Sequence, residues 1–206
     1  MRSATDRRPP ARGDQRRSAL LRSLDEHLQE SSLDSVNIAD IARAAGVTRS
    51  AFYFYFENKQ AAVAALVAGM YDEAVAATAL LSGSAAPAQN IEATIRALFG
   101  TWEKHQHIYR AMLDARATSA TVRELWESDR ASFVPLVAAV IEGERSAGRA
   151  PDGPDANDLA TVLLELNDRA LERLARGGGL SREALTATVV HVWLSSIYGA
   201  GDAGAR

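Results

Sequence analysis

Apolar residues recur every three or four positions along most of the chain, which is the spacing of one face of an α-helix. Leu20, Leu24 and Leu28 form one such stripe. The periodicity predicts nine helices, at about residues 14–30, 37–45, 48–56, 58–81, 89–105, 108–115, 120–147, 155–176 and 181–198. Alternating runs of β-branched residues are absent from the sequence. We therefore expect an all-α fold.

Glycine, proline and serine mark the breaks between these segments. Residues 82–88 (SGSAAPA) follow the fourth helix, residues 148–155 (GRAPDGPD) form a loop, and three glycines at 177–179 end the eighth helix. Pro135 lies inside the predicted helix at 120–147. We expect it to kink that helix, because proline removes one hydrogen bond and crowds the preceding turn.

The stretch at 37–59 has the pattern of a helix-turn-helix. Asn37 is a good N-cap for a first short helix, Gly46 can turn the chain with positive φ, and Thr48 can cap a second short helix. Two short helices joined by a glycine-containing turn define this motif. Its second helix enters the major groove of DNA and its first helix lies across the backbone.

Five successive aromatic residues at 52–56 strengthen this interpretation. Phe52 and Phe56, four apart, can supply the buried stripe of a short helix. All five cannot face inward, so at least two must be exposed beside Arg49 and Lys59. The plainer alternatives are an alanine-rich helical pair with a glycine turn, and an aromatic cluster that belongs to the core.

At these residues the chain resembles the DNA-binding domain of the TetR family of bacterial transcriptional repressors. The block IADIARAAGVTRSAFYFYFENK carries the resemblance. The body segments ARATSATVRELWES, AAVIEGERSAG, LATVLLELNDRAL and VVHVWLSSIYG are similar to those of a mycobacterial branch of that family. The resemblance implies about nine helices, with an N-terminal three-helix head on a larger helical ligand-binding and dimerisation body. The expected parts are a flexible basic arm at 1–13, a helix-turn-helix domain at 14–59 and the body at 60–206.

The motif suggests which side chains contact DNA. Thr48, Arg49 and Ser50 are candidates near base edges, although Arg49 is equally suited to a phosphate. The residues expected to hold phosphates and fix the register on the duplex are Asn37, Tyr53, Tyr55 and Lys59. Lys59 also begins the predicted helix at 58–81, so its ammonium and the helix N-terminus together form a candidate anion site.

The body contains the residues of a ligand cavity. Large side chains on three predicted helices, with one amide on a fourth, make up the candidate site: Phe99, Trp102, Phe133, Leu136, Val137, Trp193 and Asn167. An apolar pocket with one polar group to orient a ligand is typical of small-molecule sites. The alternative is that these residues fill the core. The resemblance implies a hydrophobic channel in which Asn167 orients the ligand, but Leu98, Leu136 and Leu164 replace more aromatic or polar groups of that branch.

Charge is distributed unevenly over the chain. The net charge is −3, yet residues 1–60 carry +2 and the remainder carries −5. A basic end on an acidic body fits contact with DNA, because phosphate attraction acts within a Debye length of roughly 10 Å.

The sequence offers little for catalysis. There is no cysteine, and the four histidines show no zinc-binding spacing. No nucleophile-elbow, phosphate-binding or dinucleotide glycine pattern occurs. Glu165, Asp168 and Glu172 follow helical spacing, and we expect them on a solvated or dimer-facing surface. These observations predict a protein that is not an enzyme and that uses no metal or cofactor.

The expected protein is a cytoplasmic homodimeric repressor. No apolar run approaches the length of a bilayer span, and the arginine-rich N-terminus lacks the apolar region of a secretory signal. The resemblance implies that the last two helices, at 155–176 and 181–198, form a four-helix dimer interface. Two heads would bind a pseudo-palindromic DNA operator, and a small hydrophobic ligand would modulate that binding. The alternatives are a constitutive DNA-binding regulator, a helical protein-partner module and a helical enzyme.

Overall fold

The computed structural model describes residues 12–199, and over these residues the chain is helical without any strand. In chain order the elements are α1 (Arg12–Glu30), α2 (Ile38–Ala44), α3 (Arg49–Tyr55), α4 (Lys59–Thr78), the 3₁₀ helix η1 (Ala79–Ser82), α5 (Pro87–Lys104), α6 (Gln106–Thr118), α7 (Ala120–Ser132), α8 (Val134–Ser146), α9 (Ala156–Ala175) and α10 (Arg182–Tyr198). The all-α prediction is confirmed. The predicted flexible arm falls mostly outside the described residues, and α1 already begins at Arg12.

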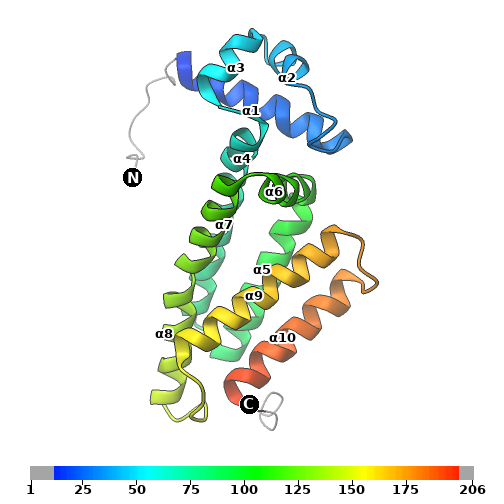
Figure 1. The fold of residues 1–206 in the computed structure, drawn as a ribbon. Coiled ribbons are helices and arrows are strands. Elements are labelled where there is room, and N and C mark those ends of the chain that lie inside the picture. The colour runs from blue at the N-terminus through cyan, green and yellow to red at the C-terminus, as the bar shows by residue number, and fades with distance from the viewer. Residues whose placement is uncertain (1–11, 200–206) are drawn as a thin grey trace.

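Helices α1, α2 and α3 form a small head at one end of the molecule (Figure 1). Its centre is made by Leu24, Ile41 and Phe52, one from each helix, and all three side chains are fully buried. The Ser23 hydroxyl donates to the carbonyl of Ile41 at 3.0 Å and fastens α1 to α2. Gly46 has a φ of +69°, so it makes the predicted left-handed turn between α2 and α3.

Helix α4 connects the head to the body (Figure 1). Asn58 caps it as predicted, with Oδ1 accepting from the amide of Ala61 at 2.8 Å. By length and composition alone, the 24 residues Lys59–Ser82 could span a membrane, so the expectation that no segment reaches that length was wrong. The stretch is rich in alanine and carries Asp72 and Glu73 in its middle. Glu73 pairs with Lys104 of α5 at 2.9 Å, which favours a role as a linking helix of the body.

The predicted helix at 120–147 is two helices, α7 and α8, which meet at Phe133. Pro135 has no amide hydrogen to donate to the carbonyl four residues earlier, so the hydrogen-bond ladder is interrupted there. In addition, the amide of Phe133 donates to the carbonyl of Arg130, three residues earlier, at 3.1 Å, which tightens the last turn of α7. The predicted kink is therefore a complete break, and it brings the number of α-helices in the described part to ten.

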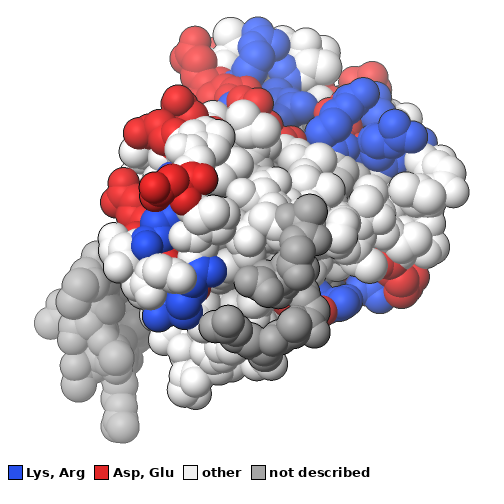
Figure 2. All heavy atoms as spheres, turned by 90° about the horizontal axis from the view of Figure 1, so that it is seen from below, with Lys and Arg blue, Asp and Glu red and all other residues white. Residues whose placement is uncertain are grey.

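The body is a bundle in which α9 and α10 lie side by side (Figure 1). The carboxylate of Glu144, near the end of α8, is buried and accepts hydrogen bonds from Arg149 Nη2 at 2.6 Å and from the Tyr198 hydroxyl at 3.2 Å. These bonds fasten the end of α10 to α8 and to the loop after it. Seen from below, acidic and basic side chains gather along the upper part and the two sides of the molecule, and the described surface between them is largely uncharged (Figure 2).

Candidate nucleic-acid interface and ligand cavity

Helix α3 separates its aromatic residues between two faces. Phe52 and Phe56 are buried, whereas Tyr53 is 46% exposed and Phe54 is 82% exposed. Tyr55 is half-buried. The division expected from the sequence is confirmed for Phe52 and Phe56, and Tyr53 is exposed as expected. The second exposed ring is that of Phe54, whereas Tyr55, also expected on the surface, packs partly against the core.

The exposed surface of α3 has a central stripe and a flank. Ser50 and Phe54 lie four residues apart, on the side of the helix opposite the buried Phe52. Arg49 and Tyr53 form the flank: Arg49 Nη2 donates to the Tyr53 hydroxyl at 3.4 Å, and the guanidinium lies 5.7 Å from the ring centre. The guanidinium is thus held at the surface without a carboxylate partner in this bond, so it remains a cation suited to a phosphate or a base edge.

Two of the predicted DNA contacts also cap helices. Thr48 Oγ1 accepts from the amide of Ala51 at 3.2 Å, and Asn37 Oδ1 accepts from the amide of Ala39 at 2.8 Å. Both residues are exposed. Their oxygens stabilise helix starts, so a contact with DNA would use the Asn37 amide nitrogen or the hydroxyl hydrogen of Thr48.

Lys59 does not lie free at the end of α4. Its ammonium donates to three backbone carbonyls in the connection between α1 and α2: Leu33 at 2.7 Å, Asp34 at 3.2 Å and Val36 at 2.8 Å. An ammonium has three hydrogens to donate, and these bonds use all of them. The expected anion site at Lys59 is therefore not formed in this structure. Lys59 instead holds the loop that leads into Asn37 and α2.

The cations that remain at the head surface are arginines. Arg16, Arg17 and Arg22 of α1 are exposed, and the Arg17 guanidinium lies 5.3 Å from the ring centre of Phe56. This contact brings α1 and the end of α3 together.

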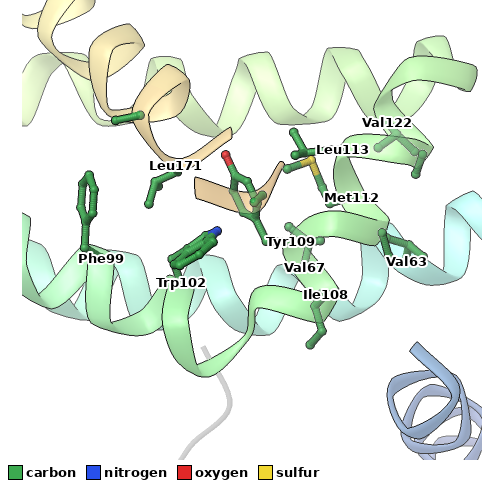
Figure 3. Close-up of a cluster of buried hydrophobic side chains, with 14 of the residues drawn as sticks. Val63, Val67, Phe99, Trp102, Ile108, Tyr109, Met112, Leu113, Val122 and Leu171 are labelled. Atoms are coloured by element: carbon green, nitrogen blue, oxygen red, sulfur yellow. The ribbon is translucent and has the colours of Figure 1, made fainter. Parts of the chain in front are cut away.

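The body encloses an apolar cavity of about 150 Å³, bounded by residues of every α-helix from α4 to α10. Six of the seven predicted ligand residues line it: Trp102, Phe133, Leu136, Val137, Asn167 and Trp193. The seventh, Phe99, is fully buried but is not part of the cavity wall. Figure 3 shows Phe99 apart from the neighbouring rings of Trp102 and Tyr109. Phe99 is thus a core residue, which was the alternative left open for each aromatic side chain.

Asn167 and Trp193 are directly bonded. Trp193 Nε1 donates to Asn167 Oδ1 at 3.0 Å, and both residues are buried. The amide oxygen is therefore engaged by the protein, and the group that Asn167 can offer to a ligand is its Nδ2 donor.

The cavity wall also contains a carboxylate that the sequence interpretation misplaced. Asp168 lines the cavity and accepts from Trp126 Nε1 at 3.2 Å and from Arg130 Nη1 at 3.4 Å. Burial raises the pKa of Asp168 to about 6, although Arg130 and the Trp126 indole lower it. The expectation of a solvated or dimer-facing position was wrong. A usable signal was present, because Leu164 and Leu171 lie on the same helical face as Asp168.

Two polar atoms in the wall have no hydrogen-bond partner within the described structure. They are Trp102 Nε1 and the Tyr109 hydroxyl, both buried and both on residues that line the cavity. Their rings meet edge to face with centres 6.4 Å apart, and Figure 3 shows them next to each other. A buried donor without a partner is costly, so these groups favour a ligand that carries an acceptor.

Helix α6 contacts both the cavity and the head. Its Tyr109 and Met112 line the cavity. Its His107 Nε2 lies 2.6 Å from Asp25 Oδ1 of α1. A displacement of this short helix by a ligand would therefore act directly on the head.

Residues 20–66 match the family model for bacterial regulatory proteins of the tetR family, and residues 91–199 match that for the C-terminal domain of the transcriptional regulator EthR. The chain is 35% identical over 192 residues to the HTH-type transcriptional regulator EthR of Mycobacterium tuberculosis H37Rv, which covers 91% of this chain and 89% of that protein. It is 32% identical over 191 residues to EthR of Mycolicibacterium smegmatis, with 91% and 88% covered.

A solved structure shows the same fold at low sequence identity. The transcriptional regulator FadR from Bacillus subtilis in complex with stearoyl-CoA matches with a TM-score of 0.70 and 16% identity, covering 88% of this chain and 99% of that chain.

Proposed function

Because the chain belongs to the TetR family of bacterial transcriptional regulators, we propose that it is a cytoplasmic repressor. In this proposal it binds a pseudo-palindromic operator as a homodimer. It releases the operator when a small hydrophobic ligand enters the body. The observation that carries this proposal is the exposed surface of α3, where Arg49, Ser50 and two aromatic side chains stand free of the core. Regulators of this family bind DNA and small ligands and are dimers.

The proposed DNA contacts follow from the geometry of the head. Helix α3 enters the major groove, with Ser50 near base edges and Arg49 at a base or a phosphate. Asn37 and Thr48 at the starts of α2 and α3, together with Tyr53 and Tyr55 of α3, contact the DNA backbone, as do the exposed arginines of α1. We remove Lys59 from the set of phosphate contacts, because its ammonium is occupied by the loop before α2.

The proposed dimer uses α9 and α10. Both helices expose apolar side chains, with Val162 of α9 61% exposed and Val192 of α10 36% exposed. Exposed valines on two adjacent helices are suited to a four-helix interface with a second copy. Such a dimer would carry two heads, one for each half of a pseudo-palindromic operator.

The proposed ligand is small and largely apolar. A cavity of about 150 Å³ is smaller than the roughly 300–1,000 Å³ of sites for drug-sized molecules, so a longer ligand would have to widen it. The FadR structure is a complex with stearoyl-CoA, and by analogy of fold the apolar cavity of this chain is proposed to accept an apolar chain. The Asn167 Nδ2 group, Trp102 and Tyr109 would orient an acceptor of the ligand.

Release of the operator by a ligand requires that the ligand and the operator favour different conformations of the protein. A ligand with equal affinity for the operator-binding and the released conformation would leave the populations of the two unchanged. Helix α4, which runs from the head into the cavity wall, and α6, which touches α1 through His107, are the elements that can transmit the difference.

The proposal is tested by selecting DNA from a random duplex library with the purified full-length protein. We expect the selected sequences to contain an inverted repeat. Light scattering should show two protein copies, or a multiple of two, on the selected duplex. An apolar ligand that raises the melting temperature of the protein should lower its affinity for this duplex. Failure to enrich any sequence would overturn the proposal. Selective binding that no apolar ligand weakens would instead support a constitutive regulator.

A further inference from the structure

Phe54 has the largest exposed fraction of any large apolar side chain in the described part of the chain, at 82%. It lies in α3, a helix of seven residues. A phenylalanine on this surface gains nothing from water or from a phosphate, since it has neither charge nor hydrogen-bonding group.

Phe54 lies on the side of α3 that faces away from the core of the head. It lies two residues after Phe52, whose side chain is fully buried, and so points to nearly the opposite side of α3. Ser50, one turn earlier, shares that side. The part of α3 that would approach the floor of a major groove is therefore one hydroxyl and one phenyl ring.

The ring of Phe54 is braced by its neighbour. Its centre lies 5.0 Å from that of Tyr55, with the two planes at 87°. Tyr55 is half-buried and packs against the hydrophobic core of the head. An edge-to-face pair of this kind favours one ring orientation, so Phe54 loses less conformational entropy on binding than an unsupported side chain would.

In the major groove, the apolar group that the bases present is the C5-methyl of thymine. Resting on the proposed function, we propose that Phe54 is a specificity-determining residue that contacts thymine methyl groups in each half-site. Arg49 and Tyr53 on the flank hold backbone or guanine atoms, and the phenyl ring of Phe54 selects thymine through contact with its methyl group.

The test uses the duplex selected by the full-length protein and a series of duplexes in which single thymines are replaced by deoxyuridine. This replacement removes the methyl group and keeps the base pair. We expect one or two positions in each half-site where the wild-type protein loses about fourfold in affinity, the change expected for losing one buried methyl-sized group. The Phe54→Ala variant should bind the thymine and deoxyuridine duplexes at these positions with equal affinity.

Two further variants separate base reading from other roles. Phe54→Leu keeps an apolar side chain and should keep part of the discrimination. Tyr53→Phe alters the flank, and any loss it causes should be the same for thymine and deoxyuridine. Because Phe54 is mostly exposed, all variants should melt within a few degrees of the wild type.

The inference is overturned if the wild type shows no thymine preference at any position, or if Phe54→Ala retains the full preference. If Phe54→Ala loses the same affinity for the thymine duplex as for the deoxyuridine duplex, Phe54 serves general positioning of the helix, and this result also contradicts the inference. If no sequence is enriched at all, the proposed function itself fails, which is a distinct result.

Discussion

The indole of Trp193 on α10 donates a hydrogen bond to the amide oxygen of Asn167 on α9, over 3.0 Å and without access to water. This bond joins the two helices that we assign to the dimer interface, and it does so in the wall of the cavity. The same pair therefore contributes to the fold and determines which atom of Asn167 faces a ligand.

Breaking this bond should destabilise the body. Asn167→Leu leaves the indole hydrogen without an acceptor, and Trp193→Phe leaves the amide oxygen without a donor. Each should lower the free energy of unfolding by about 1–3 kcal/mol.

The double variant should lose less unfolding free energy than the two single variants combined, as chemical denaturation can show. Additive effects would mean that the bond contributes little. Ligand-induced stabilisation should change in both single variants, whereas operator affinity without ligand should stay close to that of the wild type.

Lys59→Met should act on the stability of the head. The three carbonyls of the loop before α2 would lose their donor, which we expect to cost on the order of 2–3 kcal/mol. Operator affinity should fall because Asn37 and α2 are less well placed. The slope of affinity against salt concentration should be unchanged, whereas loss of a phosphate contact would reduce it by about one.

Arg16→Ala is the matched control for that measurement, because it removes a cation from the exposed side of α1. It should reduce the salt slope by about one with little effect on melting. A reduced slope for Lys59→Met together with unchanged stability would restore the phosphate role of Lys59.

Asp168 should make stability depend on pH in an unusual direction for a carboxylate. Burial places its pKa near 6 in the folded protein, above the ordinary value of 3.8. The folded state therefore holds this proton more tightly than the unfolded state does. The resulting stabilisation is fully present below pH 3.8 and is lost as pH rises through about 6.

Asp168→Asn should remove that loss. The difference in unfolding free energy between variant and wild type should grow between pH 4 and pH 7 by on the order of 2 kcal/mol in favour of the variant. A constant difference for Asp168→Asn across this range would show that the carboxyl is ionised throughout.

Val162→Glu should disrupt self-association. A carboxylate placed on the exposed apolar surface of α9 would be desolvated in a four-helix interface. Light scattering should then give the mass of one chain, 22.1 kDa, and operator affinity should fall with it. Leu125→Glu on α7, also at an exposed apolar site, should leave the dimer intact. A dimer that survives Val162→Glu would place the interface elsewhere.

Local signals in the sequence were sufficient for much of the fold. Asn37, Thr48 and Asn58 cap the helices that they were expected to cap, and Gly46 adopts positive φ. Each of these features depends on residues within a few positions along the chain. Pro135 was located correctly as an irregularity, but its effect was underestimated.

Features that depend on distant parts of the chain were not accessible in this way. The partners of Lys59 lie 23–26 residues earlier, so no local pattern announces them. Phe99 and Trp102 are both apolar and lie one turn apart on α5, and only the packing of the other helices determines that Trp102 alone lines the cavity. Asp168 was misjudged because charge was given more weight than its position between Leu164 and Leu171.

The break between α7 and α8 gives the cavity a place where its size can change. Phe133 lies at this junction and lines the cavity, and no hydrogen bond from residue 135 has to be broken for the two helices to alter their angle. A ligand longer than the present cavity can therefore be accommodated by bending one wall at the proline, while the hydrogen bonds within both helices remain intact. The range of molecules that fit would then depend on the stiffness of this joint as well as on the side chains around it.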